Sequence, residues 1–213
     1  MKNGNVEDLE DKWPQHSDRL FQPGSWRHTA HILTDPGERF FRMPQGYMRA
    51  ADLLVDQALT DDGDRKNILY PALFCYRQSV ELYLKQLIAN SGPSKASAGY
   101  TGRKGKRGPN HKLDDLWNEF KAILQDRGHM DTFGMLPMEI LIQELHDADA
   151  GSDGFRYPAM KDGNPFTFGD RDIDFEKLRE SMHGVQNFFE CADMAMAHED
   201  DVASELTEAC GIW

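Results

Sequence analysis

The segment from Asn67 to Asn90 constrains the fold of this chain more than any other. Its apolar residues recur three and four positions apart, the spacing of one helix face. On a helical wheel Arg77 lies at the edge of that face, and Glu81 and Lys85 lie progressively farther from it. The segment therefore predicts a long helix with a half-buried Arg77, whose apolar stripe comprises Leu69, Leu73, Tyr76, Val80, Tyr83, Leu84 and Leu87.

Four further segments show helical periodicity. A proline that suits a first helical turn opens the segment from Pro44 to Thr60. Another helix is expected over 111–126, with Asn110 as its N-cap. A third follows Leu136-Pro137 and ends near residue 150, and a last one runs from a cap at Asp172 or Asp174 to about His198. No segment alternates apolar and polar residues long enough for a strand, so the sequence predicts an all-α, up-and-down helical bundle.

The expected domain organisation has three parts. Residues 1–42 are polar and interrupted by prolines and glycines, which predicts an irregular N-terminal arm. Its aromatic residues, among them Trp13 and Trp26, suggest that the arm packs against its own domain or a second subunit. Residues 43–198 form the helical domain, and residues 199–213 form an acidic tail.

Composition narrows the possible partners. The formal net charge of -12 disfavours a protein coated for nonspecific nucleic-acid binding, although it allows a local basic site. The three cysteines are widely spaced, which favours free thiols in a reducing cytoplasm. We see neither a signal peptide nor an apolar run long enough for a membrane span. No metal-ligand set or phosphate-binding motif appears, so no metal and no cofactor is predicted.

Polar residues of the long helix and the start of the next are the first functional candidates. Arg77, Glu81 and Lys85 form one row at four-residue spacing, as in a salt-bridge ladder. Alternatively, Arg77 faces a pocket and holds a phosphate. His111, at a helix start, suits a general acid or base. A capping or packing role explains His111 equally simply.

The loop between the last two helices holds a second group of candidates. Asp153, Arg156 and Tyr157 lie in the segment Ser-Asp-Gly-Phe-Arg-Tyr-Pro. These side chains either close over the start of the long helix or form a structural latch. In the latch, Arg156 pairs with Glu81 or Asp153 while its aromatic neighbours seal the end of the bundle.

A glycine-rich basic segment, residues 91–110, is the third candidate. Its cations among small residues are typical of a loop that grips single-stranded RNA, with Tyr100 available for stacking. A solubilising insert has the same composition. The predicted RNA-binding residues are Lys95, Arg103, Lys104, Lys106 and Arg107.

Taken together, three of these segments resemble the HEPN-like family over roughly residues 43–198. They are the helix carrying Arg77 and Glu81, the sequence Asn-His-Lys-Leu beginning at residue 110, and the loop around Arg156. The resemblance implies a homodimeric helical bundle and roles in prokaryotic defence, stress or toxin–antitoxin systems. Many such proteins are metal-independent endoribonucleases.

Nucleases of that family pair an arginine with a histidine, with four to six residues between the two. Arg179 and His183 are separated by only three residues here, as are Arg107 and His111. If the chain cleaves RNA, we expect His111 or His183 to move the 2′-hydroxyl proton and Arg77 or Arg156 to stabilise the phosphorane. The predicted catalytic residues are Arg77, Glu81, His111, Arg156 and His183. The alternative is a non-catalytic adaptor or antitoxin that binds a protein partner from the same operon.

Overall fold

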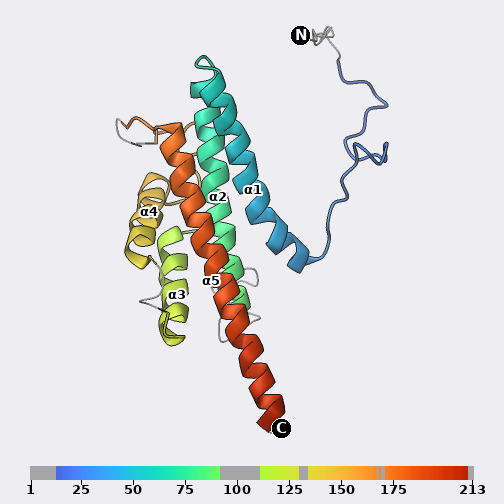
Figure 1. Cartoon of the computed structure of the whole chain (residues 1–213). Helices are drawn as coiled ribbons and strands as arrows, with labels where there is room; N and C mark the ends of the chain where they lie inside the picture. The colour runs from blue at the N-terminus through green and yellow to red at the C-terminus, as the bar shows by residue number, and fades with distance from the viewer. Residues whose placement is uncertain (1–12, 92–110, 130–133, 167, 169–170, 211–213) are drawn as a thin grey trace. The chain divides into compact units, whose positions relative to one another are not determined.

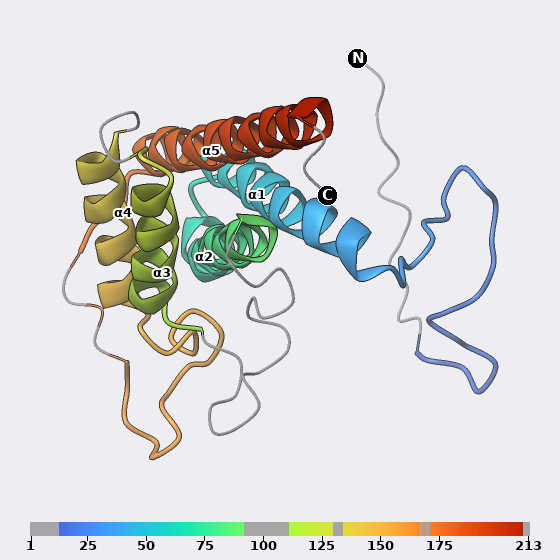
Figure 2. The same cartoon turned by 90° about the horizontal axis from the view of Figure 1, so that it is seen from below.

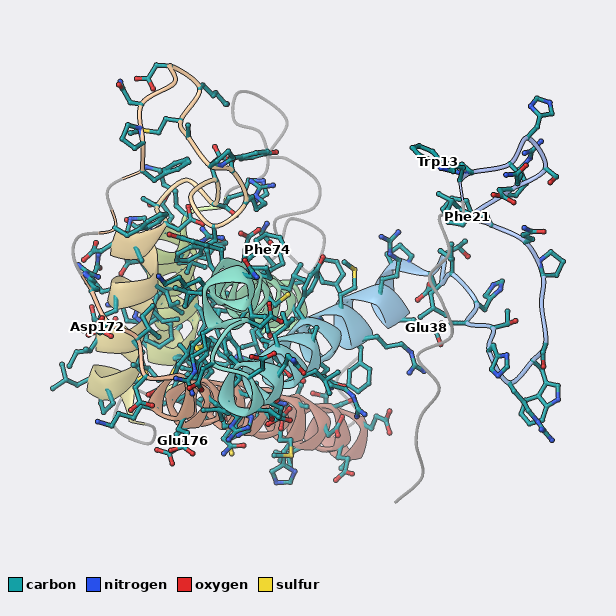
Figure 3. The ribbon with its side chains drawn as sticks, turned by 90° about the horizontal axis from the view of Figure 1, so that it is seen from above. Trp13, Phe21, Glu38, Phe74, Asp172 and Glu176 are labelled. Carbon is teal, nitrogen blue, oxygen red and sulfur yellow. The ribbon has the colours of Figure 1, made fainter. Side chains whose placement is uncertain are left out.

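A computed structural model of the chain describes residues 13–91, 111–129, 134–166, 168 and 171–210. The chain divides into two compact units, Met1–Thr34 and Asp35–Trp213. In the first unit the described residues form turns without a helix or strand. They carry several strongly exposed apolar side chains, including Trp26. Trp13 and Phe21 are two more of these side chains (Figure 3).

The second unit is an all-α bundle, as predicted. Its helices are α1 (Pro36–Thr60), α2 (Arg65–Ser91), α3 (Leu113–Asp126), α4 (Met135–Ala148) and α5 (Phe175–Cys210) (Figure 1). The residues that the structure describes include no strand. The predicted bounds of α2 and α3 agree with these helices to within two residues. Asn110, the predicted cap of α3, lies outside the described residues.

Helix α2 is the central element of the bundle. It contacts α1, α3 and α5, while α3 also pairs with α4. Viewed from below, α1 and α5 lie on one side of it and the α3–α4 pair on another (Figure 2). Most α2 side chains from Tyr76 to Ile88 are buried, on every side of the helix. Each fully buried large apolar side chain contributes about 1.5–3 kcal/mol to stability, and the core includes Met48, Val55, Tyr76, Val80, Leu84, Leu113, Phe120, Val185 and Phe189.

Helix α1 begins eight residues earlier than the sequence predicted. Asp35 is its N-cap, and the Asp35 carboxylate accepts the N–H of Glu38 at 2.8 Å. Pro36 then occupies the first turn, the position that the prediction assigned to Pro44. Pro44 is instead buried inside the helix, where its carbonyl accepts the hydroxyl of Ser79 at 2.7 Å. The predicted helix start at Pro44 was therefore wrong.

Helix α5 continues through Cys210, so the expected helix end near His198 was also wrong. The start was predicted correctly, because Asp174 accepts the N–H groups of Glu176 and Lys177. Near the expected end, Arg127 donates to Asp200 at 2.9 Å, and His129 pairs with Glu199 at 2.7 Å. These contacts attach the beginning of the acidic extension to the segment after α3, which favours its continuation as helix.

Candidate functional site

A buried arginine lies at the centre of the candidate site. Arg77 has no exposed surface. Its Nε donates to the carbonyl of Asp149 at 3.0 Å, and its Nη2 donates to the carbonyl of His111 at 2.7 Å. Its Nη1 donates to Glu81 at 3.0 Å. The planar fork thus ties α2 to the start of α3 and to the turn after α4.

Glu81 collects three of the charged or polar groups at this site. Its Oε2 accepts from Arg77, and its Oε1 lies 2.7 Å from Nζ of Lys85 and 2.8 Å from Nδ1 of His111. Glu81 is 1 % exposed and Lys85 is 4 % exposed. Two cations, Arg77 and Lys85, therefore face two buried carboxylates, Glu81 and Asp149, so the formal charges balance. A balanced, hydrogen-bonded set limits the cost of burying these ions.

The sequence predicted this row but misjudged its exposure. Arg77 was expected to be half buried, with Glu81 and Lys85 farther from the apolar face; all three are buried instead. The physical reason is that α2 is covered by α3 and the turn after α4 as well as by α1 and α5. A phosphate cannot reach Arg77 in this conformation, because no solvent reaches its guanidinium.

The pKa of Glu81 reflects opposing effects. Burial raises it, but the hydrogen bonds and charges of Lys85 and then His111 outweigh burial and hold the pKa of Glu81 below its ordinary value. Glu81 is therefore ionised at neutral pH. Since a carboxylate only accepts hydrogen bonds, Nδ1 of His111 carries the proton in their contact.

This lowered pKa gives a pH prediction. A carboxyl with a lowered folded-state pKa contributes stability above its unfolded-state pKa, and that contribution is lost as pH falls through the folded value. We therefore expect the wild type to lose stability below about pH 4 more steeply than Glu81→Gln. Denaturant unfolding from neutral to acidic pH measures both slopes. If the stability of both proteins fell equally steeply with pH in the acidic range, the lowered pKa of Glu81 would be contradicted.

Asp149 is the site residue that sequence analysis missed. It is buried, and its Oδ1 accepts the N–H groups of Asp153 and Gly154, each at 2.9 Å. Its Oδ2 lies 3.5 Å from Nε of Arg77. Asp149 thus shapes the turn after α4 and fastens it to α2. An aspartate at a helix end, followed after one alanine by glycine and serine, was the available signal, because such residues favour turns that bind backbone amides.

Arg156 follows the latch arrangement with one of its two predicted partners. Its Nη2 donates to Asp153 at 2.8 Å, and its Nε donates to the carbonyl of Ser152. The guanidinium also lies 6.0 Å from the centre of the Phe74 ring and 5.4 Å from that of Tyr157. Phe74 is labelled in Figure 3, on α2. About two fifths of the Arg156 side chain is exposed (39 %), so Arg156 still reaches solvent.

His111 is the partly exposed member of the Arg77 network. Its side chain is 49 % exposed, although Nδ1 is held by Glu81. With the proton on Nδ1, Nε2 has a lone pair, and it makes no hydrogen bond to a described residue. A histidine oriented by a carboxylate in this way is suited to accept and return a proton.

His183 belongs to a different group of residues, between α1 and α5. Its Nε2 lies 3.1 Å from both carboxylate oxygens of Asp52, and Arg179 pairs with Asp56 one turn away. The hydroxyl of Tyr76 donates to Asp52 at 2.8 Å. Burial, and then this hydrogen bond, raise the pKa of Tyr76 well above its ordinary value. Arg179 and His183 thus join helices within one chain.

The structure brings Arg77, Glu81 and His111 into direct contact and links Arg156 to them through the turn that Asp149 stabilises. It does not bring His183 into that network through any contact among the described residues. The predicted RNA-binding residues lie outside the described part of the chain: Lys95, Arg103, Lys104, Lys106 and Arg107.

Replacing Arg77 by lysine separates the role of its charge from that of its shape. Lysine keeps the charge, but one ammonium cannot serve Glu81 and two carbonyls on different segments. We expect Arg77→Lys to lower the free energy of unfolding by about 2–3 kcal/mol, since buried acceptors lose their donors. Denaturant unfolding at neutral pH tests this, with the exposed Arg49→Lys as control. Equal stability of both variants would show that charge alone suffices.

No three His, Cys, Asp or Glu side chains among the described residues come together as a metal-ligand set. Within the same part of the chain, no helix has the length and apolarity that crossing a membrane requires.

No protein-family model, curated protein or solved structure matches this chain. The resemblance to HEPN-like proteins stays a prediction from the three sequence segments.

Proposed function

We propose that this chain is a HEPN-like protein of a prokaryotic defence, stress or toxin–antitoxin system that acts as a metal-independent endoribonuclease. The observation that carries the proposal is the pairing of Glu81 and His111. A buried carboxylate orients Nδ1 of a half-exposed histidine and leaves Nε2 for acid–base chemistry. RNA is a substrate that needs little more than such a base, because its own 2′-hydroxyl is the nucleophile.

In the proposed reaction, Nε2 of His111 takes the proton of a 2′-hydroxyl. The 2′-oxygen forms a bond to the adjacent phosphorus, and the bond from phosphorus to the 5′-oxygen breaks. The departing 5′-oxygen takes a proton from solvent or from the imidazolium, which leaves a cyclic phosphate. Glu81 stabilises the imidazolium during this step, because the negative carboxylate lies 2.8 Å from Nδ1.

Arg156 is the solvent-accessible cation that we assign to RNA binding at this site. It lies over Phe74, while His111 lies beside Glu81, two turns further along α2. That separation is about 10 Å along the helix axis. Arg156 therefore suits a phosphate near the cleaved one, and Phe74 and Tyr157 add aromatic surface. Arg77 has a positioning role, since it holds the carbonyl of His111.

Incubation of the purified protein with total RNA in EDTA tests this proposal. We expect cleavage products that end in cyclic phosphate, and products at background level with Arg156→Ala and His111→Ala. Cleavage equal to a no-protein control in the wild type would remove the nuclease function.

A second candidate is a non-catalytic adaptor or antitoxin, as part of a homodimer. The observation in its favour is that Arg77 and Lys85 both form ion pairs with Glu81 inside the protein, as expected for residues with a structural role. The net charge of -12 suits a basic protein partner. Affinity capture from the native host tests it: a stoichiometric basic partner supports this role, and capture of none counts against it.

A further inference from the structure

A groove separate from the Arg77 network lies on the helical bundle. It lies among the first half of α2, the end of α4, the loop before α5 and the first turns of α5, and its volume is about 890 Å³. Arg77, Glu81 and His111 do not line it. Grooves of this volume accommodate small organic molecules.

Aromatic rings form one wall of the groove. Phe155 and Phe168 are stacked, with ring centres 5.5 Å apart and planes at 16°. Phe166 stacks on Phe168 at 6.0 Å, and Tyr70 of α2 lies 5.9 Å from Phe168. Gly154 permits this arrangement, since a Cβ there would come within 3.0 Å of Phe168. Such a wall presents aromatic surface to a ligand in the groove.

The polar lining of the groove is negative overall. Four carboxylates line it, from Glu144, Asp147, Asp172 and Asp174, against the two cations Arg171 and Lys177. Asp172 is labelled in Figure 3, just before α5. Asp174 is occupied by capping α5, and Asp147 accepts from Gln143. Glu144 and Asp172 have no side-chain partner among the described residues, and the chain as a whole is acidic, so a cation is favoured at this groove.

We propose that this groove binds small planar aromatic cations. Stacked rings attract a positive charge through the negative potential of their faces, and that attraction grows as the ligand is desolvated. Glu144 and Asp172 add attraction from the rim. The apolar lining, including Leu73 and Met182, removes the flat faces of the ligand from water. This site is independent of the proposed nuclease function.

The test uses two probes with the same ring system: N-methylacridinium, which is cationic, and acridine, which lacks the methyl group and is neutral at mildly alkaline pH. Fluorescence titration of the full chain should give about tenfold tighter binding of the cation, the size of a favourable cation–π contribution. Phe168→Leu keeps an apolar side chain but removes a ring, and should weaken binding of the cation about tenfold. The double variant Glu144→Gln, Asp172→Asn should weaken it roughly three- to tenfold and leave acridine unaffected.

Glu180→Gln is the matched control, because it removes an exposed acid of α5 that does not line the groove. It should bind both probes as the wild type does. Equal affinity of the wild type for the two probes would overturn the proposal. So would unchanged binding of N-methylacridinium by the acid double variant, whose replaced side chains are on the surface and whose folding is easily verified by circular dichroism.

Discussion

Replacing Glu81 by alanine should lower the free energy of unfolding by about 3–5 kcal/mol, because it leaves buried cations without their carboxylate partner. Glu81 is the carboxylate that Arg77, Lys85 and His111 share. Without it, two buried cations face only Asp149. Removing one partner of a buried ion pair costs far more than the pair itself contributes.

The measurement is denaturant unfolding at neutral pH and constant salt. Glu180→Ala, at an exposed position of α5, is the control and should change stability by less than about 0.5 kcal/mol. The loss of stability in Glu81→Gln should lie between those of Glu81→Ala and Glu180→Ala, since an amide still accepts a hydrogen bond but carries no charge. A loss below about 1 kcal/mol for Glu81→Ala would mean that the cations find other partners or water.

Replacing His111 by alanine should reduce RNA cleavage by about 10²- to 10⁴-fold, the usual contribution of a positioned acid or base. The main-chain carbonyl that Arg77 holds is retained in the variant. Stability should therefore change little, and activity and folding can be separated. Initial rates on a defined single-stranded RNA, with unfolding curves of the same samples, measure both quantities.

His183 provides a close comparison for His111. Both side chains are 49 % exposed and both contact a carboxylate. His183→Ala should keep most of the cleavage, and His198→Ala, at an exposed position of α5, should keep all of it. If His183→Ala abolished cleavage while His111→Ala did not, the acid–base role would belong to the group between α1 and α5.

The helices could be predicted where local signals agreed. The limits of α2 and α3 followed from apolar spacing, and the start of α5 followed from a capping aspartate. The start of α1 was missed because two prolines each suited a first turn, and only tertiary packing around Pro44 distinguishes them. The end of α5 was missed because its acidic extension has little apolar surface, and its contacts with Arg127 and His129 are distant in sequence.

The candidate site was predicted in its members but not in its burial. A helical wheel considers only the residues of one helix. Arg77 is covered by groups 34 and 72 positions away, at His111 and Asp149. The role of Asp149 depends on a turn and on a main-chain carbonyl, which leave little trace in residue identity. Long-range pairing of this kind needs coordinates, whereas apolar periodicity does not.

The attachment of His111 to Arg77 bears on how much the length of the chain between α2 and α3 can change. That segment starts where α2 ends, at Ser91, and rejoins the bundle at a carbonyl held by the same helix. Both of its ends are thus attached to the same helix, α2. Doubling the length of a loop between fixed ends costs only about 0.6 kcal/mol. A change in the length of the chain between these two points should therefore cost the helical bundle little stability.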